Sequence, residues 1–237
     1  MPPSRTNPVR CDRSLLSLLW LLPLTALAGD PLIDPHADLL YRQALPLLEK
    51  ADAQSNALPL DVLPTDGELI RKVQALDQTL QPAVALLQRA ALLQHPVAEY
   101  RLALHYIPHL PAAQIAAEAC PLLRSSIAQG FAPAALEVVN WCPDLLEDRA
   151  FRQDLEQVAA RSSFYAGYYP QPAVRLLCLR ERPQGLALQW GRQRDFQAEV
   201  YRLLAGLDAN QRVSYVQKAM DLNGCQAARR QLVSQHP

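Results

Sequence analysis

Glycine, aromatic residues and uncompensated charge are all scarce in this sequence. Its 237 residues include only eight glycines and 6% aromatic residues, and basic and acidic residues number 23 each. So few glycines disfavour a fold rich in tight β-turns. A balanced surface has no field that attracts phosphate groups, so nucleic acid is not an expected partner.

Sequence motifs of well-known chemistry are missing as well. The chain has no glycine-rich phosphate loop, no Gly-x-Ser-x-Gly elbow, no Ser-x-x-Lys and no Cys-x-x-Cys. His105 and His109 are spaced like a metal pair on a helix, but Pro108 is expected to end the helix before His109. We therefore expect no metal site, no cofactor and no catalytic residue, although acid–base carboxylates need not be close in the chain.

Helix-forming residues dominate what is present. Half of the sequence is hydrophobic and there are 20 prolines; much of the apolar content is Ala and Leu, and its spacing is three to four residues. Asp34-Pro35 is typical of a helix start, and Thr65-Asp66-Gly67-Glu68 of a capping box that opens a helix with Leu69, Ile70, Val73 and Leu76 inward. The predicted fold class is all-α, and no segment has a clear strand pattern. Further helices are predicted at 82–94, 96–107, 111–129, 132–142, 148–161, 171–180, 184–206, 209–222 and 225–234.

The N-terminal segment is typical of a secretory signal peptide. Three arginines precede an uncharged hydrophobic run, Leu15–Leu27, which ends with Ala26-Leu27-Ala28 before Gly29. The run is too short to cross a bilayer comfortably, which disfavours the alternative of an uncleaved anchor. Cleavage near Ala28 would leave a soluble periplasmic or secreted chain without membrane insertion. The predicted divisions are a signal peptide (1–28), an N-terminal helix with a linker (29–64) and a helical repeat domain (65–237).

Four cysteines remain after that cleavage: Cys120, Cys142, Cys178 and Cys225. An even number in an exported chain predicts two disulfides. Three pairings are possible. We favour Cys120–Cys142 with Cys178–Cys225, because each joins neighbouring helical segments.

Two stretches of the chain resemble each other at an offset of 36 residues. Residues 83–106 and 119–142 then align Ala83 with Ala119, Gln94 with Gly130, Ala98 with Ala134 and Leu102 with Val138, and a third copy is suggested near Gly224 and Ala228. Each unit is predicted to be a helix, a turn and a second helix, which must stack on neighbouring units to bury its apolar face.

This pattern is similar to Sel-one-like repeats, relatives of tetratricopeptide repeats. The resemblance is carried by Arg89-Ala90-Ala91, Ala98, Tyr100 and Leu102, although Gln94 replaces the glycine of the turn. It implies stacked helical hairpins in a short α-solenoid that binds a partner protein or peptide, in envelope assembly, as a secretion accessory, or in immunity to an effector. A helical enzyme acting on cell-wall glycan is the alternative. The oligomeric state cannot be inferred.

One stretch, 162–170, holds four of the twelve Phe and Tyr residues. Phe164, Tyr165, Tyr168 and Tyr169 are therefore the candidate binding residues, because exposed aromatic side chains anchor many protein interfaces. The alternative is that they fill a gap between helices. Trp141 and Trp190 lie among apolar residues and are predicted to be in the core.

Overall fold

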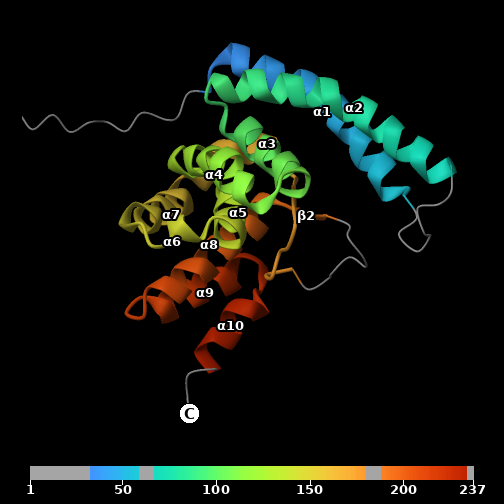
Figure 1. Ribbon diagram of the computed structural model, residues 1–237. Helices are drawn as coiled ribbons and strands as arrows, with labels where there is room; N and C mark the ends of the chain where they lie inside the picture. The colour runs from blue at the N-terminus through green and yellow to red at the C-terminus, as the bar shows by residue number, and fades with distance from the viewer. Residues whose placement is uncertain (1–32, 59–66, 180–187, 234–237) are drawn as a thin grey trace, which may run out of the picture. The chain divides into compact units, whose positions relative to one another are not determined.

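Helices form most of the part of the chain that the structure describes (Figure 1). This computed structural model describes residues 33–58, 67–179 and 188–233, all within one unit, Pro31–Pro237. The predicted signal peptide and the first half of the predicted capping box lie outside these residues. The helices are α1 (Pro35–Asn56), α2 (Gly67–Leu92), α3 (Pro96–His109), α4 (Ala112–Ala128), α5 (Ala132–Trp141), α6 (Pro143–Leu146), α7 (Arg149–Arg161), the 3-10 helix η1 (Ser162–Tyr168), α8 (Gln193–Leu207), α9 (Arg212–Asn223) and α10 (Gln226–Val233).

The first two helices pack along each other (Figure 1). Helix α1 begins as predicted: Asp34 Oδ1 accepts hydrogen bonds from the amides of His36 and Ala37, at 2.8 and 2.9 Å. Helix α2 is a single helix through Pro82, where the sequence predicted two, because Pro82 is exposed and water can replace the missing helical bond. The predicted inward orientation of Ile70 and Val73 is wrong, since they are 50% and 48% exposed.

The turns between α2 and α3 and between α4 and α5 have the same hydrogen bonds. Gln94 and Gly130 both have positive φ, 58° and 95°. In each turn the next residue's amide bonds to the carbonyl five residues back, and the positive-φ residue's amide bonds to the carbonyl three back. This is the Schellman arrangement that ends a helix. The aligned Ala98 and Ala134, four residues beyond each turn, are completely buried.

Helix α5 lies at the centre of the core. Every residue from Ala132 to Val138 is buried, and α5 contacts α3, α4, α7 and α8. One continuous apolar cluster runs from Leu40 on α1 to Leu204 on α8. A smaller cluster joins α8 to α9 and α10 around Ala219 and Cys225.

The predicted helix 171–180 is wrong. Gln171–Ala173 forms strand β1, which pairs antiparallel with β2 (Gln189–Gly191); neither short strand is predicted from the sequence. Pro170 and Pro172 interrupt helical hydrogen bonding here. Residues 180–187 are outside the described part, and the helix predicted at 184–206 begins only at Gln193.

The two favoured disulfides are present. Cys120–Cys142 joins α4 to the end of α5, and Cys178–Cys225 joins the segment after β1 to the start of α10. Chains with such bonds belong typically to oxidising compartments. Among the described residues, no helix is both long and apolar enough to cross a membrane.

Candidate functional site

The four aromatic residues predicted to form one binding surface have different environments. Phe164 is 46% exposed. Tyr165 is 1% exposed: its ring packs against Phe131, and its hydroxyl donates to the carbonyl of Gln129 at 2.7 Å. The expectation that Tyr165 is exposed is therefore wrong, and it fills the core between η1 and α5. Tyr168 and Tyr169 are half-buried.

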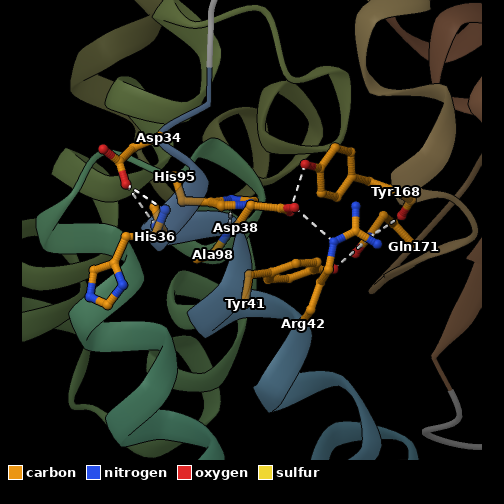
Figure 2. Close-up of polar contacts among 10 residues, drawn as sticks. Asp34, His36, Asp38, Tyr41, Arg42, His95, Ala98, Tyr168 and Gln171 are labelled. Atoms are coloured by element: carbon orange, nitrogen blue, oxygen red, sulfur yellow. Dashed lines mark hydrogen bonds and ion pairs between the residues drawn. The ribbon is translucent and has the colours of Figure 1, made fainter.

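Tyr168 connects the aromatic segment to α1 through Asp38 (Figure 2). Its hydroxyl donates to Asp38 Oδ1 at 2.8 Å, and Arg42 Nε donates to Asp38 Oδ2 at 2.7 Å. Burial alone would raise the pKa of Asp38, but the hydrogen bonds from Arg42 and Tyr168 outweigh it and lower the pKa. The Arg42 guanidinium also lies over the Tyr168 ring, 5.7 Å from its centroid.

Sequence reasoning missed His95, which lies behind this ion pair (Figure 2). It is fully buried, and its ring stacks on Tyr41 at a centroid distance of 4.8 Å. Nδ1 accepts from the amide of Ala98 at 3.3 Å, which places the proton of a neutral ring on Nε2, 3.6 Å from Asp38 Oδ1. Burial lowers the pKa of His95 and Asp38 opposes it. The only feature of the sequence that points to His95 is its position as a polar residue directly before Pro96, at the start of a helix.

A cleft of about 200 Å³ opens beside this cluster, between α1 and the segment 167–171. Leu45 and Asp52 line it from α1, Tyr168 and Trp190 from the opposite wall, and Arg101 from α3. Trp190, predicted to be in the core, is 42% exposed because its indole lies on this wall. Trp141 is also exposed, at 39%, and its indole donates to Glu137 at 3.1 Å.

Arg101 lies where the cleft meets a second cavity. Its side chain is 9% exposed; Nη2 is 3.4 Å from Asp52 Oδ2, and Cζ of the guanidinium is 5.6 Å from the centroid of the Trp190 ring. The second cavity, of about 110 Å³, shares Leu48, Asp52 and Arg101 with the cleft. Burial raises the pKa of Asp52, and the charge of Arg101 opposes it. In the sequence, the feature that points to Arg101 is a charged residue within the mostly apolar stretch 97–103, which predicts a buried helix.

Other buried carboxyl groups, among them Glu99, Glu137 and Glu199, serve as hydrogen-bond acceptors within the protein. Glu99 accepts from Ser125 Oγ at 2.7 Å and from Gln129 Nε2 at 3.0 Å. Burial raises its pKa to about 7, and the bond from Ser125 opposes this shift. Glu137 and Glu199 accept from backbone amides of the segment after β1. These carboxyl groups line neither cavity, so Asp52 and the exposed Glu49 are the acidic side chains of the cleft.

The histidine pair predicted from sequence is a stacked pair at the end of α3. The helix continues through Pro108 to His109, so the expected earlier end is wrong. The rings of His105 and His109 lie 4.4 Å apart, and His109 Nδ1 is 2.6 Å from the carbonyl of His105. No group of three or more metal-binding side chains is found within residues 33–58, 67–179 and 188–233.

Comparison of the chain with protein family models, with curated proteins and with solved structures gives no match.

Proposed function

We propose that this chain is an exported, periplasmic helical-repeat protein that binds a partner protein or peptide. The observation that carries the proposal is the cleft between α1 and the aromatic segment, where Tyr168 and Trp190 face a hollow beside Arg101. Aromatic and arginine side chains supply most of the anchoring energy at protein interfaces. Phe164, which does not line the cleft, is exposed on the same segment.

The repeat and export parts of the proposal have separate support. The identical hydrogen bonding at Gln94 and Gly130 favours repeated hairpins like those of Sel-one-like proteins. The two disulfides favour an oxidising compartment, which agrees with the predicted signal peptide. We propose that such a protein acts in envelope assembly, as a secretion accessory, or in immunity to a secreted effector.

The test is affinity capture from the periplasm with two matched variants. Trp190→Ala removes an indole of the cleft, and Trp141→Ala removes a similarly exposed indole elsewhere. A partner identified by mass spectrometry with the wild-type protein should be retained by Trp141→Ala and lost by Trp190→Ala, with helical circular dichroism unchanged in both. Equal capture by both variants would contradict the proposed site.

A helical enzyme acting on cell-wall glycan is the second candidate. The raised pKa of Asp52, inside a cleft, favours it, because general acids are often buried carboxyl groups. In that case purified protein should release soluble fragments from cell-wall glycan, and Asp52→Asn should abolish the release. No release by the wild-type protein would remove this candidate.

A further inference from the structure

The guanidinium of Arg101 has few partners for a buried charge. An arginine offers five N–H donors, and here one of them approaches Asp52, at the long distance of 3.4 Å. The side chain is 9% exposed, so most of its hydration is lost. A buried charge is costly unless it is paired and hydrogen-bonded. Because Arg101 lines the cleft, its remaining donors can be satisfied by an acceptor that enters there.

Two further donors belong to the same cleft. Arg42 lines the cleft; its Nε bonds to Asp38, and its guanidinium also interacts with the Tyr168 side chain. Tyr41 Oη accepts from Gln171 Nε2 at 3.2 Å, which leaves the hydroxyl proton of Tyr41 available. Burial raises the pKa of Tyr41, and the charges of Arg101 and Arg42 both oppose it. Tyr41 and both arginines line the same cleft.

The cleft also contains an acceptor and an apolar wall. Gln171 is 2% exposed, and its Oε1 has no hydrogen-bond partner. Leu45 and Leu48 lie between the polar groups along α1. A volume of about 200 Å³ is smaller than the roughly 300–1,000 Å³ of sites for drug-sized molecules. It therefore suits one or two residues at the end of a chain rather than a folded surface.

Negative charges at the cleft restrict what kind of anion can enter. Asp52 lines it and Glu49 stands exposed at its edge. Like charges at short distance repel, so a phosphate or a polyacidic segment is disfavoured relative to a single carboxylate. A peptide end carries one carboxylate, an apolar side chain and an amide N–H, which match the donors, the leucines and Gln171.

We propose that this cleft binds the C-terminal carboxylate of a peptide, through Arg101 with Arg42 and Tyr41. This inference rests on the proposed function and names the chemistry of the partner. Asp52 holds Arg101 when the cleft is empty and competes with the incoming carboxylate. Removing the charge of Asp52 should therefore strengthen binding, which a purely structural ion pair would not predict.

The test uses two pools of N-acetylated tripeptides of mixed sequence, one with free C-terminal carboxylates and one with C-terminal amides. Their binding to the mature protein is followed by the NMR signal of the Trp190 indole N–H, with the Trp141 indole as the internal reference. We expect the carboxylate pool to shift Trp190 alone, and the amide pool to bind about tenfold more weakly, as for the loss of a charge-assisted hydrogen bond.

Two variants complete the experiment. Arg101→Gln should lose the preference for the carboxylate pool, and Asp52→Asn should bind that pool more tightly than the wild-type protein. If Arg101→Gln does not fold, Asp52→Asn still tests the inference, because weaker binding of the carboxylate pool by Asp52→Asn would overturn it. Equal shifts by both pools would overturn it but leave peptide binding intact. No shift with either pool would also overturn it, while periplasmic capture decides the proposed function separately.

Discussion

Single polar side chains hold the irregular part of this protein in place. Glu137 Oε1 accepts from the amide of Val174 at 3.4 Å, and Glu199 Oε1 accepts from the amide of Cys178 at 2.5 Å. Both glutamates are completely buried. A buried amide without a partner costs about 1–3 kcal/mol, so these contacts replace the hydrogen bonds that a helix would have supplied.

Gly191 shows how tightly this region is packed. A Cβ added there would lie 2.6 Å from Phe196 Cε2 and 2.8 Å from Leu176 Cδ1, and both side chains are buried. Gly191→Ala should therefore lower the free energy of unfolding by about 1–3 kcal/mol, as overpacking does. Gly167→Ala is the control, because nothing lies within 4 Å of its added Cβ. Urea denaturation measures both; equal stabilities would show that the neighbours of Gly191 can move aside.

Glu99 should make stability depend on pH. Burial raises its pKa from 4.5 to about 7 in the folded chain, so the folded state holds the proton more tightly than the unfolded state. Its stabilising contribution is full below pH 4.5 and is lost as the pH rises through about 7. Glu99→Gln keeps a neutral side chain at every pH, so its stability should rise relative to wild type over that window. Glu118→Gln, at an exposed position of α4, should follow the wild-type curve in parallel urea titrations.

At the scale of helices and turns, the sequence was sufficient to predict an element wherever the contacts that stabilise that element lie within a few residues along the chain. The start of α1 follows from Asp34, whose bonds reach two and three residues along the chain. The failure at 171–180 has the opposite cause. There the backbone bonds to Tyr100 and Glu137, which are 72 and 37 residues away, and no periodicity of the segment itself contains that information.

The candidate site was predictable only in part for the same reason. The aromatic composition of 162–170 drew attention to Tyr168, which lines the cleft. It could not separate Tyr168 from the buried Tyr165, because η1 has non-helical backbone angles at Tyr165 that the sequence does not signal. Arg101 joins the site through Asp52, 49 residues earlier in the chain. An ion pair of that separation depends on the tertiary arrangement of α1 and α3, which no local pattern contains.

The second helices of the two hairpins offer a test of close packing. Ala98 and Ala134 are completely buried. Ala98→Leu and Ala134→Leu should each overpack the core and lower the free energy of unfolding by about 1–3 kcal/mol. Ala117→Leu on the exposed side of α4 should change it little. If the two buried variants unfold at the same urea concentration as Ala117→Leu, the alanines are not spacers between helices.

At the scale of the whole chain, one disulfide joins neighbouring helices and the other joins the irregular segment after β1 to the C-terminal helices. Cys178 belongs to the irregular segment, and Cys225 directly precedes α10; their bond closes a loop of 47 residues. Cys120–Cys142 closes one of 22 residues around the α4–α5 hairpin. Loops of such lengths correspond to about 3–4 kcal/mol each in the chain-entropy account. The fold should therefore depend on the redox state of its compartment.

That dependence links the disulfides to export. Signal-peptide cleavage and disulfide formation can both be measured on one sample of protein recovered from the periplasm. Cleavage after Ala28 should give an intact mass that begins at Gly29, because Ala26 and Ala28 place small side chains at the −3 and −1 positions that a signal peptidase requires. Alkylation under denaturing, non-reducing conditions should leave all four remaining cysteines unlabelled, since both pairs are bonded. A mass that retains Met1, or recovery wholly with membranes, would contradict export. Labelling of two or more cysteines would instead contradict the disulfides, and reduction before alkylation is the control that all four can be labelled.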